Sequence, residues 1–374
     1  MNGRKGAALA VATLSLTLLG ACGSFNRKAA APEPSATPTA HGHTMSAGEH
    51  TPIPANSSPL SAAQLHKMSR KAVLLLRGEL TDGSSVQGTA FIHDIDGQVA
   101  ITTAHVVEGA QDLKAVFFDG TEQPVEVVGS DDCSDLAVVR VAGRLPEESV
   151  RLPLGNSDAL APGDEVTAVG YPDRRQSRTA RAVPKPGIVQ DLNVSVNTDP
   201  SLPEFVGAIQ HDAALEPGSS GGPLLDVKGN VVGINSVSDS AGTRGPYYSI
   251  PINAAHHETD LLLTGENVNS LGWRLSAHVA DRAPTDVARA LRKAGYRGGM
   301  FVESIEPGSP VDGRVHVGDL VAKLNNKPVN TRQDVCEVLE RASPGRAIFA
   351  EGIQVFSSPR YERFRVQWTS PESQ

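Results

Sequence analysis

Short apolar runs separated by turns dominate the chain from about Leu60 to Asn253. Pairs such as Asp82-Gly83, Asp96-Gly97 and Asp119-Gly120 lie between many of these runs and are typical of tight turns. Many short strands without helices between them indicate antiparallel β-barrels or a β-sandwich. The expected strands cover residues 72–76, 88–92, 98–102, 113–118, 125–128, 136–141, 166–169, 208–210, 231–234 and 247–250.

The spacing of apolar residues is helical in only a few places. Ser61 to Arg70 precedes the first strand, and Ala254 to Leu263 follows the last one. Beyond that point the pattern becomes that of a smaller α/β unit, in which Thr285 and Thr331 each stand where a helix begins. The two structured parts predicted in this way are residues 60–263, mainly β, and residues 268–369, α/β.

The first residues of the chain have the layout of an export signal. Arg4 and Lys5 form a charged start, and residues 7–19 supply an apolar run that is short for a membrane span. The following Leu19-Gly20-Ala21-Cys22 is similar to the lipobox of bacterial lipoproteins. The resemblance implies removal of residues 1–21 as a signal peptide and acylation of the Cys22 thiol, which would anchor the protein in a membrane. The alternative is an ordinary secretory signal followed by an incidental cysteine.

A segment rich in Ala, Pro, Ser, Thr and His follows Cys22. It has almost no large apolar side chains, so it cannot bury enough surface to offset the entropy of ordering. We expect residues 22–59 to be a disordered tether that holds the folded part away from the membrane. His41, His43 and His50 could in principle bind a metal, but nothing fixes a ligand frame, so we expect solvated histidines and no metal.

Charge and cysteine content limit the partners and the crosslinks. The 374 residues carry a net charge of -8 and contain no long basic block, which argues against a nucleic-acid partner. Of the three cysteines, Cys22 is the expected lipidation site, and Cys133 and Cys336 fall in different predicted domains. A disulfide between them would need Cα atoms within about 7 Å of each other. We therefore expect Cys133 and Cys336 to be two separate thiols.

Three polar residues at the ends of strand-like runs suggest chemistry: His105, Asp135 and Ser220, in the chain order of a chymotrypsin-type triad. A serine hydroxyl is a poor nucleophile at neutral pH, so a histidine must take its proton and a buried carboxylate must hold the imidazole in one tautomer. Asp131 and Asp132 lie close by, but only Asp135 directly precedes an apolar run. We therefore assign Asp135 to the triad and expect Asp131 and Asp132 to be solvated turn residues.

Several motifs in the β-rich part stand in register with one another. They are Thr102-Thr103-Ala104-His105-Val106-Val107, Ser134-Asp135-Leu136-Ala137-Val138, Gly163 to Pro172, Ile209 to Ala213, and Gly218 to Leu224. Together they resemble the HtrA (DegP/DegS-like) family of exported, trypsin-fold serine proteases. The resemblance implies a chymotrypsin-like double six-stranded β-barrel, with His105 as general base, Asp135 as its orienting carboxylate and Ser220 as nucleophile. It also implies an oxyanion hole formed by the backbone N–H groups of Gly218 and Ser220.

The same resemblance predicts a substrate pocket just ahead of Ser220. Its base would lie around Ala214, where Asp212 belongs to the family's own Gln-His-Asp-Ala frame. A pocket without its own carboxylate favours small or medium apolar side chains over Lys or Arg. The residues expected to pair with the substrate backbone as an added strand are Ile234, Asn235 and Ser236.

The C-terminal α/β unit is similar to a bacterial PDZ domain. The backbone N–H groups around Leu271, Gly272 and Trp273 are the expected binding site for the C-terminal carboxylate of a peptide. The alternative is a PDZ fold used only for packing. The family tends to form trimers through N-terminal contacts, which are often aromatic. Residues 60–76 contain no aromatic side chain, so the homotrimer is an expectation from the resemblance alone.

These observations predict a lipid-anchored serine endopeptidase of the cell envelope that cleaves unfolded or damaged proteins. The PDZ domain would control substrate binding or activation, and no cofactor or metal is expected. The rival from another class is a proteolytically silent PDZ chaperone or scaffold, against which the complete set of triad residues argues. A signalling protease with one dedicated substrate is a narrower alternative within the enzyme class.

Overall fold

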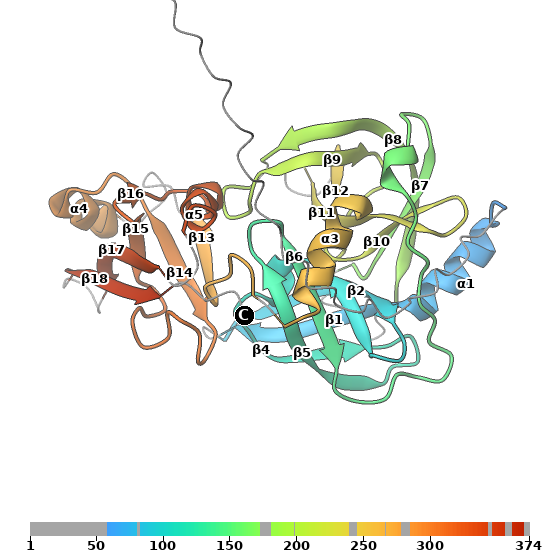
Figure 1. The fold of residues 1–374 in the computed structure, drawn as a ribbon, viewed down its shortest axis with the longest axis horizontal. Helices are drawn as coiled ribbons and strands as arrows, with labels where there is room; N and C mark the ends of the chain where they lie inside the picture. The colour runs from blue at the N-terminus through green and yellow to red at the C-terminus, as the bar shows by residue number, and fades with distance from the viewer. Residues whose placement is uncertain are drawn as a thin grey trace, which may run out of the picture. The chain divides into compact units, whose positions relative to one another are not determined.

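The computed structural model describes residues 58–80, 83–172, 181–197, 199–238, 245–265, 267–277, 285–342, 346–355 and 361–369 (Figure 1). The predicted signal peptide, the predicted lipidation site Cys22 and the predicted tether up to residue 57 lie outside these ranges. None of the helices in the described part is long and apolar enough to cross a membrane. The anchor at Cys22 therefore stays a prediction.

The first six strands close into a barrel in the order β1-β2-β3-β6-β5-β4 (Figure 1). The side chains of β1 show why, because they alternate between two apolar environments. Leu74 and Leu76 pack into a core formed by this barrel alone, whereas Val73 and Leu75 pack into a core shared with the next barrel. A run that is apolar on both faces is typical of a strand covered on both sides. The strands are β1 (Val73–Leu80), β2 (Ser85–Asp94), β3 (Val99–Thr102), β4 (Ala110–Val116), β5 (Glu122–Asp131) and β6 (Leu136–Val141).

The next six strands close into a second barrel, in the order β10-β11-β12-β9-β8-β7. Val166, Ala168 and Leu224 are buried in the core of this barrel. The two closed barrels confirm the predicted chymotrypsin-like, mainly β architecture. The strands are β7 (Glu165–Gly170), β8 (Val183–Val196), β9 (Phe205–His211), β10 (Pro223–Asp226), β11 (Val231–Ser238) and β12 (Tyr247–Pro251).

Two helices flank the barrels where the sequence predicts them. Helix α1 (Ala62–Ala72) begins with a capping box, in which the Ser61 hydroxyl accepts from the Gln64 N–H and the Gln64 side chain accepts from the Ser61 N–H. Helix α3 (Ile252–Leu262) follows β12 and packs against β6 and β11. A short 3-10 helix, η1 (Ser157–Ala159), lies between β6 and β7 in the chain.

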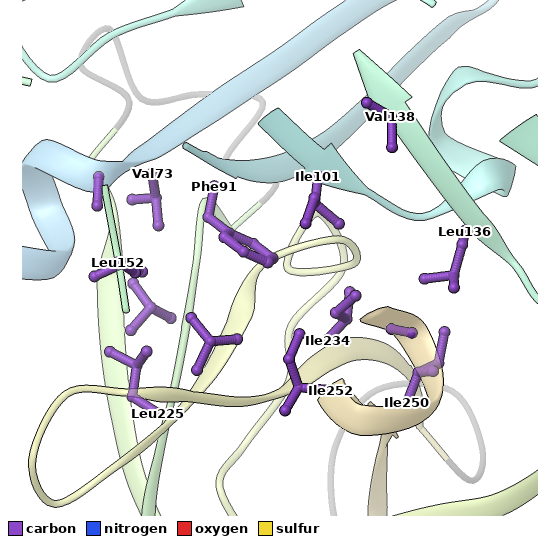
Figure 2. Close-up of a cluster of buried hydrophobic side chains, with 14 of the residues drawn as sticks. Val73, Phe91, Ile101, Leu136, Val138, Leu152, Leu225, Ile234, Ile250 and Ile252 are labelled. Carbon is purple, nitrogen blue, oxygen red and sulfur yellow. The ribbon is translucent and has the colours of Figure 1, made fainter. Parts of the chain in front are cut away.

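A shared apolar core joins the two barrels, as Figure 2 shows. Val73, Phe91 and Ile101 come from the first barrel, and Leu225 and Ile234 come from the second. Each of these side chains is at most 1% exposed. Burying one side chain of this size contributes about 1.5–3 kcal/mol. The core therefore fixes one barrel against the other, and the catalytic candidates lie on loops of both.

The C-terminal region, residues 267–277, 285–342, 346–355 and 361–369, is built on a sheet in the order β13-β14-β15-β17-β18, with β16 paired to β15. Trp273 and Trp368 are buried in its core and pack edge to face, with ring centroids 5.6 Å apart. Thr331 caps α5 in a capping box with Asp334, and this confirms the predicted helix start. The elements are β13 (Trp273–Ala277), α4 (Thr285–Ala294), β14 (Met300–Ile305), β15 (Leu320–Leu324), β16 (Lys327–Pro328), α5 (Arg332–Leu339), β17 (Ala347–Val355) and β18 (Tyr361–Thr369).

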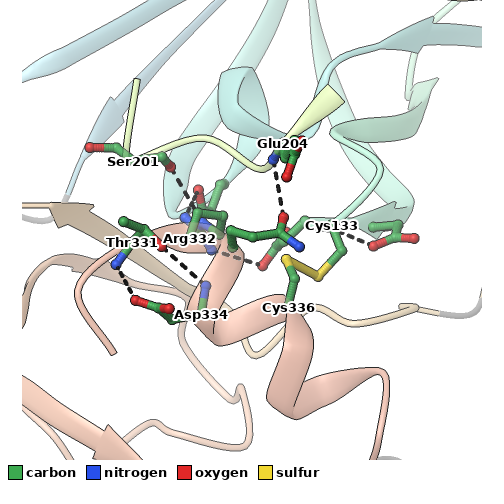
Figure 3. Close-up of a disulfide and its surroundings, with 11 residues drawn as sticks. Cys133, Ser201, Glu204, Thr331, Arg332, Asp334 and Cys336 are labelled. Carbon is green, nitrogen blue, oxygen red and sulfur yellow. Dashed lines mark hydrogen bonds and ion pairs between the residues drawn. A yellow bond between two sulfur atoms is a disulfide. The ribbon is translucent and has the colours of Figure 1, made fainter. Parts of the chain in front are cut away.

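The expectation of two separate thiols is wrong. Cys133 and Cys336 form a disulfide, with Cα atoms 5.5 Å apart (Figure 3). Cys133 lies in the turn between β5 and β6, and Cys336 lies on α5 of the C-terminal region. The two cysteines are 203 positions apart in the sequence, and only the packing of the C-terminal core against Cys133 brings them together.

Replacing both cysteines with Ser, in the form of the protein that begins after Cys22, is expected to lower the free energy of unfolding. The expected loss is about 2–4 kcal/mol, because the crosslink restricts the unfolded chain. Urea unfolding followed by circular dichroism measures this loss. Dithiothreitol should destabilise the wild type to the same extent and leave the double variant unchanged. Two titratable thiols in the unreduced wild type would contradict the disulfide.

Candidate active site

His105 lies on a single helical turn, α2 (Ala104–Val107), shortly after β3. Its Nδ1 is 2.9 Å from each carboxylate oxygen of Asp135, and its backbone N–H donates to Asp135 Oδ1 at 3.0 Å. One carboxylate thus holds both the ring and the backbone of the same histidine. With the proton on Nδ1, Nε2 is left as the basic nitrogen of the ring.

Asp135 closes the turn between β5 and β6. Its φ of 54° lies in the left-handed region, which Asp adopts more readily than most residues. Asp135 is 1% exposed, and its Oδ2 also accepts from the Ser236 hydroxyl at 2.8 Å. Donors from His105 and Ser236 satisfy a buried carboxylate that would be costly alone. The contact with Ser236 was missed by sequence reasoning, since nothing local to either residue marks it.

Asp131 and Asp132 are buried, so the expectation of solvated turn residues is wrong. Asp131 Oδ1 accepts from the Cys133 N–H at 2.7 Å, and Asp132 Oδ2 lies 3.6 Å from Arg332 Nη1. Burial raises the pKa of Asp131 and raises that of Asp132 well above its usual value. Although acidic groups gather here, no group of three or more His, Cys, Asp or Glu within the described ranges is placed to hold a metal ion.

Ser220 lies on a tight turn between β9 and β10. Gly218 and Gly221 on either side have φ angles of 92° and 82°, which residues with a side chain rarely adopt. A Cβ at position 221 would lie 2.1 Å from the Thr89 carbonyl oxygen. Thr89 also donates through its N–H to the Ser220 carbonyl and through its hydroxyl to the Gly218 carbonyl. The first barrel therefore holds the serine turn that the second barrel carries.

The Ser220 hydroxyl donates to the Ser236 carbonyl at 3.0 Å. No hydrogen bond joins this hydroxyl to His105 in the described part of the chain. Such bonds between catalytic groups often form only when substrate is present. The N–H groups of Gly218 and Ser220 donate to no other described residue. Two unused donors next to the hydroxyl are what an oxyanion hole requires.

The structure uses Ile234 and Asn235 differently from the predicted pairing with substrate. Both are fully buried in β11. The Asn235 N–H donates to the Gly222 carbonyl, and the Asn235 carbonyl accepts from the Gly221 N–H. Ile234 is paired with a neighbouring strand on each side. Because these backbones are occupied within the barrel, Ser236 alone of the three stays a candidate for pairing with substrate.

Ala214 packs against an apolar cluster that contains Ala213 and Leu215. Of the two acidic residues nearest to Ala214 in the sequence, Glu216 pairs with Lys185 at 2.7 Å. The other, Asp212, is exposed, and its Oδ1 accepts from the Ile188 N–H at 2.7 Å. This carboxylate is therefore engaged with β8 and does not join the apolar cluster. An apolar pocket around Ala214 is consistent with this arrangement and stays a prediction.

Leu271, Gly272 and Trp273 lie at the start of β13. Leu271 and Trp273 are buried in the core of the C-terminal region. Gly272 has a φ of 68°, and its carbonyl accepts from the Glu306 N–H at 2.7 Å. Binding of a peptide carboxylate by this loop stays a prediction.

Side chains from the C-terminal region reach the turn that carries His105. Arg274 on β13 donates to the His105 carbonyl at 2.8 Å, and Ser304 on β14 donates to the Gly109 carbonyl at 2.7 Å. Arg332 on α5 binds the carboxylate that directly follows this turn. Sequence reasoning missed these contacts because the partners are 169, 195 and 224 positions apart and no local motif marks them.

Residues 88–234 match the family of trypsin-like peptidase domains, and this range contains His105, Asp135 and Ser220. The chain is 31% identical over 261 residues to the serine protease Do-like HtrB of Bacillus subtilis (strain 168). The matched stretch covers 67% of this chain and 55% of that protein. It is 33% identical over 272 residues to the probable periplasmic serine endoprotease DegP-like of Halomonas elongata. This match covers 70% of this chain and 52% of that protein.

The chain belongs to the HtrA family of trypsin-fold serine proteases. Among solved structures, the HtrA-type protease AlgW with tripeptide matches at a TM-score of 0.50 and 27% identity, over 83% of this chain and 96% of that one. The chain spans a little over half the length of the two curated HtrA relatives.

His211, at the end of β9, is linked to the serine turn of this HtrA-family chain through Ser249 and Asn235. It is fully buried, and its Nε2 lies 3.0 Å from the Ser249 Oγ, whose hydroxyl donates to Asn235 Oδ1 at 3.1 Å. Burial lowers the pKa of His211 to about 4, so the ring is neutral at pH 7. The Asn235 backbone is hydrogen-bonded to Gly221 and Gly222, directly after Ser220. Protonation of His211 would therefore disturb the hydrogen bonds that hold the serine turn.

Lowering the pH from 7 to 4 is expected to cost about 3 kcal/mol of stability through His211. The pKa is about 4 in the folded protein against 6.5 for a free histidine, so the unfolded chain takes up the proton first and stability falls as the pH falls. His211→Gln keeps an N–H for Ser249 but cannot titrate. Urea unfolding of the wild type and the variant between pH 4 and 7 isolates the contribution of His211 to the pH dependence of the free energy of unfolding. A stability difference that does not change with pH would contradict the assignment.

Proposed function

We propose that this chain is an exported serine endopeptidase that cleaves protein substrates through an acyl-enzyme formed at Ser220. The observation that carries the proposal is the contact of His105 Nδ1 with both oxygens of Asp135 at 2.9 Å, next to a serine held on a glycine turn. Membership of the HtrA family and the trypsin-like match over residues 88–234 support it.

In the proposed reaction the Ser220 oxygen attacks the scissile carbonyl carbon while His105 Nε2 takes the hydroxyl proton. The carbonyl π electrons move to the oxygen, and the N–H groups of Gly218 and Ser220 stabilise the resulting oxyanion. His105 then gives its proton to the leaving amine as the C–N bond breaks. Water, deprotonated by His105, attacks the acyl-enzyme, and Ser220 leaves and regains its proton. Asp135 accepts from Nδ1–H and stabilises the imidazolium.

The proposed location follows from the N-terminal sequence. Residues 1–21 act as a lipoprotein signal peptide, Cys22 carries the lipid, and residues 22–59 form the tether. One relative is named as a periplasmic endoprotease, which supports export of this chain. The folded part then faces the periplasm or the cell exterior, with residues 60–263 as protease domain and residues 268–369 as PDZ domain.

Unfolded or damaged proteins are the proposed substrates, and the C-terminal region is the proposed site for C-terminal peptides. The AlgW structure is described as containing a tripeptide, which supports peptide binding within this family. Arg274 and Ser304 touch the His105 turn, so a change in the C-terminal region has a direct route to the active site. A homotrimer stays an expectation from the family.

Replacing Ser220 with Ala is expected to lower turnover of an unfolded casein-like substrate by as much as ~10⁶-fold, because the nucleophile is lost. Ser219→Ala, which removes the neighbouring hydroxyl, is the matched control and should keep its activity. A fluorophosphonate should label the wild type and the control but not the Ser220 variant. A wild type that neither cleaves nor becomes labelled would favour the silent scaffold.

Matched peptides that differ only at the residue before the scissile bond test the pocket around Ala214. Small or medium apolar residues are expected to give a kcat/KM at least about tenfold above that of Lys or Arg, because an apolar pocket leaves a buried charge unpaired. Ala214→Asp should raise the relative kcat/KM for Lys. Equal cleavage after Lys and Val by the wild type would rule out the apolar pocket.

A further inference from the structure

Arg332 lies where the C-terminal region meets both segments that carry the histidine and the aspartate. It is the first residue of α5 and is 3% exposed. Its Nη2 lies 2.6 and 2.9 Å from the two oxygens of Glu108, and its Nη1 lies 3.6 Å from Asp132 Oδ2. Glu108 directly follows the helical turn of His105, and Asp132 belongs to the turn that ends in Asp135. One guanidinium therefore bridges the two segments.

The turn that carries His105 has little support of its own. Helix α2 has four residues, and its N-cap Thr103 makes no side-chain cap bond. A helix of one turn is not stable by itself, because its few hydrogen bonds do not offset the entropy of ordering. Within the described residues, the side-chain hydrogen bonds to this turn and to Glu108 just after it involve Asp135 and the C-terminal region, where Arg332 Nη2 donates to both carboxylate oxygens of Glu108.

The segment ahead of Asp135 is attached to the same helix. Figure 3 shows Arg332 and Cys336 on α5, with Cys336 joined to Cys133 by the disulfide. Residues four apart lie on one face of a helix, so the guanidinium and the disulfide meet this segment side by side. Arg332 Nε also donates to the Ser201 carbonyl at 3.4 Å, which fixes the orientation of the side chain.

The buried charges depend on one another. Burial disfavours the charged form of Arg332, but the carboxylates of Glu108 and Asp132 outweigh it and raise the pKa of the guanidinium. Burial and the nearby Glu108 raise the pKa of Asp132 well above its usual value, and Arg332 opposes this rise. Without the guanidinium, the carboxylates of Glu108 and Asp132 would lose the cation that they share while staying largely buried, which is costly.

We propose that Arg332 is a positioning residue for the reaction, which holds the His105 turn and the Asp135 segment in register from the C-terminal region. The inference rests on the proposed protease function. Arg332 acts through Glu108 and Asp132 and does not touch the substrate. Its effect belongs in kcat, because a displacement of about 1 Å between catalytic groups can cost ~100-fold in rate.

The test uses the full chain that begins after Cys22, with Arg332→Gln. We expect kcat on a peptide substrate to fall about 10- to 100-fold while KM changes less than about twofold. Labelling of Ser220 by a fluorophosphonate should slow by the same factor as kcat. Arg341→Gln is the matched control, since it removes an exposed ion pair with Glu337 just after the same helix, and its kcat should equal that of the wild type.

A double variant separates positioning from folding. Adding Glu108→Gln to Arg332→Gln removes one unpaired buried charge, so we expect the melting temperature to recover while kcat stays low. If Arg332→Gln alone does not fold, kcat and the labelling rate of the double variant are compared with those of the wild type instead. Thiol titration checks that its disulfide has formed. Wild-type kcat and labelling rate in either variant would overturn the proposal. An inactive wild type would instead contradict the proposed function.

Discussion

The burial of the Asp135 carboxylate is the constraint on which the geometry of the active site depends. A carboxylate that is 1% exposed is costly unless donors surround it. His105 supplies its ring and its backbone N–H, and Ser236 supplies a hydroxyl. These donors come from a helical turn of the first barrel and a strand of the second. Satisfying one buried charge therefore draws both barrels together and sets the tautomer of the histidine.

The serine turn is held by contacts from each of the two barrels. Thr89 of the first barrel bonds the carbonyls of Gly218 and Ser220, and Asn235 of the second barrel bonds the backbone just after the serine. The apolar core between the barrels keeps these supports in place. The candidate nucleophile and base thus stand on loops, but the loops are held by strands on both sides. Such support is what precise positioning of a nucleophile and its base requires.

The C-terminal region is more closely joined to the active site than a tethered module would be. It contacts the turn of His105 through Arg274 and Ser304, and it is crosslinked to the turn of Asp135 by the disulfide. In addition, the Ala277 N–H of β13 donates to the Ser201 side chain. Any movement of this region relative to the first barrel would therefore act on the segments of His105 and Asp135 together.

Local patterns in the sequence were sufficient for the elements of the fold and for the candidate triad. Short apolar runs separated by turn pairs predicted the strands, helical spacing predicted the helix that follows Ser61, and Thr331 predicted a helix start through its cap. These features depend on near neighbours in the chain, because backbone geometry and capping act over a few residues. The two closed barrels followed from the family resemblance.

Only the tertiary structure decided which residues are buried and paired across long separations. It joined Cys133 to Cys336, covered Asp132 with Arg332, and used the backbone of Asn235 to hold the serine turn. In the sequence, Asp132 looks like a turn residue and the two cysteines look independent. Their state depends on which side chain packs over them, and that partner lies about two hundred positions away. Burial and pairing depend on residues that are distant in the sequence and meet only in the packed chain, whereas strands, caps and turns depend on residues that are close in the sequence.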